Sequence, residues 1–331
     1  MITKTLNPPI GRSTLPFIDA SHPDKPLEVN CYRPARHQPN DPVIVVQHGM
    51  LRNGDDYRDF WIDAAEKHNL LIVAPTFPNE PFPKAEGYNN GLVVSADGAI
   101  APRAEWLYAV PGRVLNALRA AGVIDKPVIR IFGHSAGGQF VHRMLATEGG
   151  ALFEAAMASN PGWYTLPTPE RHFPEGLGGL GLDAAALTRW LAYPMILFAG
   201  DRDIVTDDPN LPAQPEALAQ GPHRYGRAHF MLDFARAEAA RLGTACNWSL
   251  ITVAGVGHDG AAMSRAAAAY WFEGRIPGVE ELKPAGAVAC AFGSVEPGAS
   301  VPGRREGRAM PASTAQVSPT LRNRAGRARR A

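Results

Sequence analysis

One stretch of twenty residues limits the folds open to this chain more than any other. Residues 128–132 form a short apolar run of the kind found in buried strands, and residues 136–147 have the length and apolar spacing of a helix. Only Gly133-His134-Ser135 separates the two. A buried strand that passes so directly into a helix is typical of a parallel sheet with crossover helices.

The rest of the chain repeats this alternation of short β-rich runs and amphipathic stretches. Right-handed crossovers then place helices on both faces of one sheet. We therefore predict an α/β fold with an open, mostly parallel sheet of about eight strands, in which the first two strands form an antiparallel hairpin. The predicted strands are residues 15–18, 27–32, 43–47, 70–74, 128–132, 154–159, 194–199 and 249–254. The predicted helices are residues 57–68, 103–121 with a break at Pro111, 136–147, a part of 220–242, and 260–272.

The composition fits one large domain followed by a tail. Of the 331 residues, 45% are hydrophobic and 20% charged, as in ordinary globular proteins. We assign residues 1–284 to a single domain. Within it, residues 160–191 are rich in glycine, proline and aromatic residues and are expected to form an insertion over the carboxyl edge of the sheet. Residues 285–331 have few large apolar side chains, so we expect a disordered basic tail.

Charge and hydropathy exclude several classes of partner. The formal net charge is +1, and residues 291–331 carry eight arginines and two glutamates, so the first 290 residues carry about −5. An acidic body predicts no nucleic-acid partner. No run approaches the ~18 apolar residues of a membrane helix, so we expect no membrane partner. The start of the chain lacks an apolar segment of signal-peptide length, and the three cysteines are an odd number at no metal-type spacing, so we expect reduced, buried thiols. These features predict a cytoplasmic protein.

The turn at Ser135 has the sequence Gly-x-Ser-x-Gly. A sharp strand-to-helix turn exposes the serine hydroxyl at the carboxyl edge of the sheet, and Gly133 and Gly137 allow the backbone to turn tightly. The free N–H groups at the start of the helix suit a developing oxyanion. A bystander serine in a structural turn is the alternative, but the strand before and the helix after favour a nucleophile.

This arrangement resembles the nucleophile elbow of the α/β-hydrolase superfamily, and more closely its serine esterases, over residues 15–274. The resemblance implies the chain order serine, acid, histidine. The acid follows a later strand, and the family's Gly-x-x-Asp pattern favours Asp203 over Asp201, which more naturally caps the turn. His258 stands between the last predicted strand and the last predicted helix, where the family places its base.

The resemblance also implies an oxyanion hole. Gln47-His48-Gly49-Met50 follows a predicted strand, and in the family this loop supplies one N–H donor, here from Met50. The second donor is the N–H group of Ala136, and His48 has a structural part in shaping the loop. Met50 after Gly49, together with Ser-Ala-Gly-Gly from Ser135, favours the branch of polyhydroxybutyrate depolymerases and feruloyl esterases.

The other sequence motifs give no indication of a bound cofactor or metal ion. Residues 176–181 match a dinucleotide-binding string, but Pro174 and Glu175 precede them in place of a strand. The chain has no Gly-x-x-x-x-Gly-Lys and no His-Glu-x-x-His motif, so we expect no cofactor and no metal.

Trp163 and Tyr164 follow a predicted strand end, and we expect them to line a pocket for an apolar acyl or alcohol group. The other rings expected near the sheet end are Phe77, Phe82, Tyr88, Phe173 and Trp190. Packing of these rings onto the sheet is the competing interpretation.

These features together predict a hydrolase of small carboxylic esters that uses Ser135, Asp203 and His258 and passes through an acyl-enzyme. An amidase, peptidase or lactonase would use the same residues. A binding protein on a hydrolase fold is a remote alternative, because no member of the predicted triad is missing. The sequence sets no oligomeric state.

Overall fold

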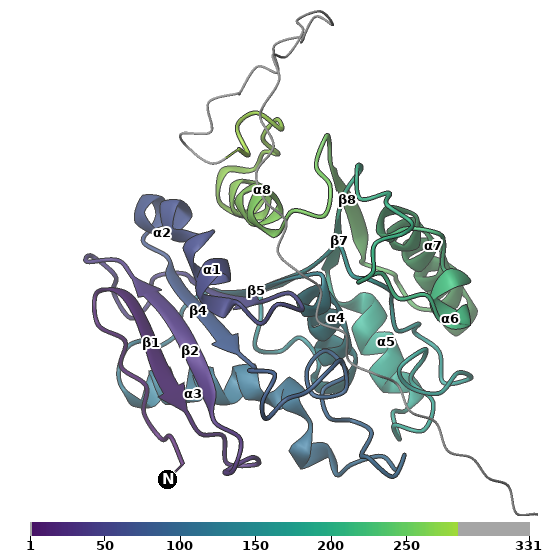
Figure 1. The fold of residues 1–331 in the computed structure, drawn as a ribbon, viewed down its shortest axis with the longest axis horizontal. Helices are drawn as coiled ribbons and strands as arrows, with labels where there is room; N and C mark the ends of the chain where they lie inside the picture. Colours follow the sequence, from purple (N-terminus) through teal and green to yellow (C-terminus); the bar gives the residue numbers. More distant parts are fainter. Residues whose placement is uncertain (1, 284–331) are drawn as a thin grey trace, which may run out of the picture. The chain divides into compact units, whose positions relative to one another are not determined.

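The computed structural model of the chain describes residues 2–283 (Figure 1). Its core is an eight-stranded sheet in the order β1-β2-β4-β3-β5-β6-β7-β8. The pairs β1–β2 and β2–β4 are antiparallel and all others are parallel. The predicted open, mostly parallel sheet and its antiparallel first hairpin are confirmed.

The elements alternate along the chain as expected. The strands are β1 (Gly11–Phe17), β2 (Leu27–Arg33), β3 (Val43–Gln47), β4 (Leu71–Thr76), β5 (Ile129–His134), β6 (Ala155–Ser159), β7 (Met195–Gly200) and β8 (Ser249–Val253). The helices are α1 (Gly54–Asp59), α2 (Ile62–His68), α3 (Val110–Ala120), α4 (Ala136–Glu148), α5 (Ala184–Ala192), α6 (Pro215–Leu218), α7 (Arg224–Leu242) and α8 (Gly260–Glu273). Two short 3₁₀ turns, Arg103–Glu105 and Leu107–Ala109, precede α3.

Two hydrophobic layers sandwich the sheet. β3 shows the division most simply, because Val43 and Val45 point into one layer while Ile44 and Val46 point into the other. Helices α3, α4, α5 and α7 contribute to the first layer, and α1, α2 and α8 to the second. A strand buried on both faces is apolar throughout, which explains the unbroken run of residues 43–46.

Two predictions for helices are wrong. The helix predicted over residues 57–68 is two helices, since the chain turns after α1 and buries Trp61 completely against Phe132, with ring centroids 5.4 Å apart. The helix predicted over residues 103–121 is shorter and has no break at Pro111: two 3₁₀ turns take the place of its first part, and α3 begins at Val110 with Pro111 in its first turn, where its missing N–H group needs no partner.

The insertion over residues 160–191 contains a helix that the composition did not indicate. Asp183 begins α5 by accepting a hydrogen bond from the N–H group of Ala186 at 2.8 Å. Residues 160–182 are irregular, yet most of them are buried. The glycine and proline content therefore predicts the irregular part correctly and conceals the helix.

The basic tail predicted over residues 285–331 lies outside the described residues. Within residues 2–283, no helix has both the length and the apolar character needed to cross a bilayer. The cytoplasmic location stays a prediction.

Candidate active site

The turn at Ser135 joins β5, a strand in the middle of the sheet, to α4. Ser135 has φ 58° and ψ −117°, a conformation that side-chain-bearing residues rarely adopt. Its N–H group donates to the carbonyl oxygen of Ser159 at 2.8 Å, which ties the turn to the end of β6. The serine hydroxyl is thereby held at the carboxyl edge of the sheet.

Close backbone contacts explain the two glycines of the motif. A Cβ atom on Gly133 would lie 2.2 Å from the carbonyl oxygen of Gly137, and one on Gly137 would lie 2.2 Å from that of Gln47. Both obstacles are backbone atoms of neighbouring segments, which cannot rotate away. The glycines are therefore needed for strand, turn and helix to approach each other.

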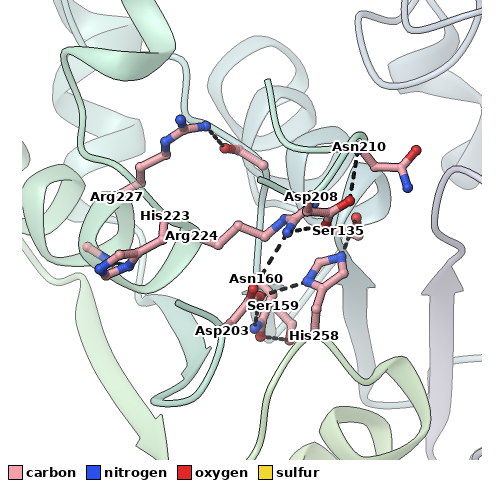
Figure 2. A network of polar contacts seen from close by, with 12 residues as sticks. Ser135, Ser159, Asn160, Asp203, Asp208, Asn210, His223, Arg224, Arg227 and His258 are labelled. Atoms are coloured by element: carbon pink, nitrogen blue, oxygen red, sulfur yellow. Dashed lines mark hydrogen bonds and ion pairs between the residues drawn. The ribbon is translucent and has the colours of Figure 1, made fainter. Parts of the chain in front are cut away.

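The structure brings Ser135, His258 and Asp203 together (Figure 2). His258 Nε2 lies 3.0 Å from Ser135 Oγ, and His258 Nδ1 lies 2.7 Å from Asp203 Oδ2. The three side chains come from the loops that follow β5, β8 and β7. The carboxylate selects the tautomer in which Nδ1–H donates, so Nε2 is the acceptor for the serine hydroxyl.

Asp201 has a different place in the same turn. Its Oδ1 accepts a hydrogen bond from the N–H group of Gly255 at 2.7 Å, which links the turn after β7 to the loop before His258. A Cβ atom on Gly200 would lie 2.3 Å from the carbonyl oxygen of Val256, so these two loops also touch through their backbones. Asp203, and not Asp201, reaches His258.

Asp203 is 1% exposed and is held by further polar groups. Asn160 Nδ2 donates to Asp203 Oδ2 at 2.6 Å, and Arg224 Nη1 lies 3.6 Å from Asp203 Oδ1. Burial acts to raise the pKa of Asp203, but the hydrogen bonds from His258 and Asn160 and the nearby positive charges outweigh it. The pKa of Asp203 therefore lies below its ordinary value, and the carboxylate is charged.

Sequence reasoning missed Asn160 and Arg224. Asn160 directly follows β6 and has a left-handed backbone (φ 46°), so its place at the carboxyl edge was a usable signal. Arg224 begins α7, and nothing around it in the sequence marks it as a neighbour of Asp203.

His134, which sequence reasoning also missed, supports His258. The ring of His134 packs against that of His258 with centroids 4.6 Å apart, and His134 Nδ1 lies 2.8 Å from Tyr57 Oη. Burial lowers the pKa of His134 well below its ordinary value, so this ring is neutral. An uncharged ring braces the face of His258 without opposing the positive charge that a general base acquires.

The loop after β3 lies beside Ser135. A Cβ atom on Gly49 would come within 3.9 Å of Ser135 Cβ. His48 is buried, and burial lowers its pKa to about 3. As a neutral ring it accepts from the N–H group of Phe77 at 3.1 Å, while its Nδ1 lies 2.8 Å from the carbonyl oxygen of Gly49. His48 thus shapes the loop that carries Met50.

The predicted oxyanion donors are Met50, which lines the same clefts as Ser135, and Ala136, which directly follows Ser135 in the chain. Met50 follows Gly49 and is half exposed, and Ala136 is the first residue of α4. An N–H group in the first turn of a helix has no acceptor within that helix. The groups are therefore in the segments that the family resemblance assigns to them.

Two adjoining clefts open at Ser135. The larger has a volume of about 970 Å³ and the smaller about 430 Å³, and both are lined by Met50, Ser135 and Asn210. Trp163 lines the larger cleft, and Tyr164 does not. Its ring is fully buried against His142, with centroids 5.4 Å apart.

The large cleft is more polar than the predicted aromatic pocket. Of the rings expected near the sheet end, Trp163 and Phe173 line it. The other expected rings are buried in the core and do not line the cleft; they are Phe77, Phe82, Tyr88 and Trp190. Amide and carboxylate side chains take their place in the lining, namely Glu86, Asn89, Asn90, Gln139, Glu170, Glu175, Asn210, Gln214 and Glu216.

Comparison with solved structures identifies the family. LpqC, a poly(3-hydroxybutyrate) depolymerase from Bordetella parapertussis, is 52% identical to this chain with a TM-score of 0.81, over 83% of this chain and 93% of that one. The chain belongs to the α/β-hydrolase superfamily, in its serine-esterase branch. The family and branch predicted from the sequence are confirmed.

Two further members of the superfamily are informative. Poly(aspartic acid) hydrolase-1 from Sphingomonas sp. KT-1 is 34% identical with a TM-score of 0.75, over 78% of this chain and 97% of that one. An S-formylglutathione hydrolase from Agrobacterium tumefaciens shares the fold at 17% identity and a TM-score of 0.51, over 84% of this chain and all of that one. No protein-family model and no curated protein sequence matches the chain.

Proposed function

We propose that this α/β-hydrolase cleaves carboxylic esters through Ser135, His258 and Asp203 and a covalent acyl-enzyme. The proposal depends above all on one observation, the continuous chain of hydrogen bonds from Ser135 Oγ to His258 and on to Asp203. Nucleophile, base and orienting acid in this order are what acyl transfer to a serine requires.

The first half of the reaction acylates the serine. His258 Nε2 takes the hydroxyl proton as Ser135 Oγ attacks the ester carbonyl, and Asp203 stabilises the imidazolium that forms. The N–H groups of Met50 and Ala136 donate to the resulting oxyanion, each contributing about 3 kcal/mol in comparable sites. When the tetrahedral intermediate collapses, the ester C–O bond breaks and His258 returns the proton to the departing alcohol.

The second half releases the acid. Water takes the place of the alcohol and gives its proton to His258, and its oxygen attacks the acyl carbon. Collapse of the second tetrahedral intermediate breaks the bond to Ser135 Oγ, which recovers the proton from His258. Overall, one ester and one water give one acid and one alcohol.

The relatives and the cleft suggest the class of ester. The 52% identical relative is a depolymerase of a polyester, and the two clefts that Ser135 lines give room for an acyl group and an alcohol group of several units. The large cleft carries four glutamates and one arginine, an excess of three negative charges. An uncharged oligoester of a hydroxy acid fits this surface better than a polyanion such as poly(aspartic acid).

Amide hydrolysis is the second candidate, because a 34% identical relative is a poly(aspartic acid) hydrolase. Turnover of p-nitrophenyl butyrate compared with butyryl p-nitroanilide distinguishes the two, since both substrates have the same acyl group. We expect the ester to be the better substrate by at least a hundredfold; equal turnover would favour the amidase.

The assignment of the triad can be tested with paired variants. We expect Ser135→Ala to lower kcat for p-nitrophenyl butyrate by about 10⁶ and to abolish labelling by a fluorophosphonate. Asp203→Asn should lower kcat by about 10⁴, because it stabilises the wrong tautomer of His258. Asp201→Asn is the matched control two residues away, and it should retain most of the activity. Full activity in Ser135→Ala would exclude this mechanism.

A further inference from the structure

One segment forms the border between the two clefts. Asn210 lines both of them, and residues 209–214 line the larger. Its first anchor is Asp208, whose Oδ1 accepts from the N–H group of Asn210 at 2.8 Å. The carbonyl oxygen of Asp208 also accepts from the N–H group of Leu211 at 2.9 Å. The local shape of this border segment, residues 208–214, therefore depends on Asp208.

Asp208 is in turn held by the buried side chain of Arg224. Its Oδ2 lies 2.7 Å from Arg224 Nη1, and the Arg224 side chain is 1% exposed. The same Nη1 lies 3.6 Å from Asp203 Oδ1. Figure 2 shows the consequence, a connected series of polar contacts from Ser135 through His258, Asp203, Arg224 and Asp208 to Asn210.

The two carboxylates share the buried cation unequally. Asp203 has His258 and Asn160 on its other oxygen, so it keeps strong partners without Arg224. Asp208 has a side-chain exposure of 20%, and Arg224 is its ion-pair partner in the described part of the chain. The closer contact, 2.7 Å against 3.6 Å, is the one to Asp208. Arg224 therefore holds the border segment through Asp208 more directly than it holds Asp203.

We propose that Asp208 and Arg224 are positioning residues that fix residues 208–214 beside Ser135, so that this segment determines how long an ester the clefts accept. The inference rests on the proposed ester hydrolysis and adds the determinant of substrate size. A fixed border holds the remote parts of a long ester, and binding there orients the scissile bond. A short ester contacts only the surroundings of Ser135 and does not depend on the border.

The test compares two substrates in two neighbouring variants. Asp208→Asn keeps the size of the side chain and an oxygen for the Asn210 N–H group but removes the charge that holds Arg224. Asp207→Asn makes the same charge change one residue earlier, at an exposed carboxylate without a polar partner among residues 2–283. For each variant, kcat/KM is measured with p-nitrophenyl acetate and p-nitrophenyl octanoate, and thermal unfolding is followed by circular dichroism.

We expect Asp208→Asn to lower the ratio of octanoate to acetate kcat/KM by about tenfold, mainly through KM, while Asp207→Asn leaves the ratio within twofold. Equal ratios in the two variants, or an equal loss on both esters through kcat, would overturn the proposal. A smaller fraction of folded protein lowers kcat/KM for both esters by the same factor, so it does not change their ratio. A parent protein inactive on both esters would instead contradict the proposed function.

A double variant tests whether the two residues act as one unit. Arg224→Lys keeps the positive charge but cannot bridge two carboxylates in the same way. If Asp208 acts through Arg224, then Asp208→Asn combined with Arg224→Lys should lower the ratio no further than Arg224→Lys alone. Independent, multiplying effects would show that Asp208 does not work through the buried arginine.

Discussion

The turn at Ser135 and the wall of the large cleft differ in what fixes them. The turn is fixed by backbone contacts so close that Gly133 and Gly137 have no room for a side chain. The wall, residues 160–182, is irregular, and besides hydrogen bonds within its own backbone it depends on side chains that come from distant helices and loops. Gln220 makes two hydrogen bonds to the backbone of Tyr164, at 2.8 and 2.7 Å.

The difference lies in what each arrangement can tolerate. A steric fit between backbones accepts almost no substitution, and it holds the reacting group. A wall tied by side-chain hydrogen bonds can be reshaped one contact at a time, and it faces the substrate. The esterase thus combines a rigid site of chemistry with an adjustable site of selection. Three substitutions measure how far this contrast extends, in order of decreasing effect on the free energy of unfolding.

Gly137→Ala should have the largest effect. Its Cβ atom would meet the backbone of Gln47 at 2.2 Å, so β3 and α4 must separate, and we expect the free energy of unfolding to fall by about 3 kcal/mol or more. Urea unfolding is the measurement. Gly278→Ala is the control, because its Cβ atom would have its nearest neighbour at 3.9 Å and it should change stability by less than about 0.5 kcal/mol. Similar losses in the two variants would refute the steric account.

Gln220→Met should have an intermediate effect. Methionine has a similar size but cannot replace either hydrogen bond, which leaves a buried N–H group and a buried carbonyl of Tyr164 unpaired. We expect a loss of about 2 kcal/mol in urea unfolding, with a higher KM for long esters. Gln214→Met, at an exposed position, should cost much less. A Gln220→Met protein as stable as the parent would mean that the wall does not depend on these two hydrogen bonds.

Asn160→Gly should have the smallest effect, and one that depends on pH. Glycine accepts the left-handed backbone, so the losses are the hydrogen bond that Asn160 donates to Asp203 and the one that it accepts from the Ser159 hydroxyl, of which the first contributes about 1 kcal/mol at pH 7. A carboxyl group whose pKa is lowered in the folded protein adds stability above its ordinary pKa, and this stability is lost as the pH falls through the lowered value. The difference between parent and Asn160→Gly should therefore shrink from pH 7 to pH 3.

Asn160→Ala is the companion variant, and it should cost about 1 kcal/mol more at both pH values because of the backbone. Urea unfolding at the two pH values checks both expectations. A cost of Asn160→Gly that did not change with pH would mean that Asn160 acts on something other than the charge of Asp203.

The same contrast explains what the sequence could reveal. Ser135 and His258 were predictable because glycines, a strand and a helix surround each of them within a few residues, and such local constraints are written in the sequence. The inner strands such as β3 were predictable for a similar reason, since a strand buried on both faces must be apolar throughout its length, whereas the half-polar edge strand β1 was predicted only over residues 15–18.

The partners of the supporting residues were not predictable, because each residue acts across a long separation in the chain; the place of Asn160 after β6 signals only that it lies at the carboxyl edge. Tyr57 meets His134 over 77 residues, and Asn160 meets Asp203 over 43. A polar residue gives no local sign of such a partner. The same holds for the cleft, where aromatic composition suggested a pocket and tertiary packing buried most of the rings.

The three proposed catalytic side chains come from loops after β5, β7 and β8, and Ser135 is 123 residues from His258. No local segment of the chain can contain the reactive centre, and a nascent polypeptide that lacks β8 has no base. Ester turnover therefore requires that β8 has joined the sheet. The rate at which activity returns during refolding would measure how fast the sheet is completed, and an incompletely folded protein would not cleave esters.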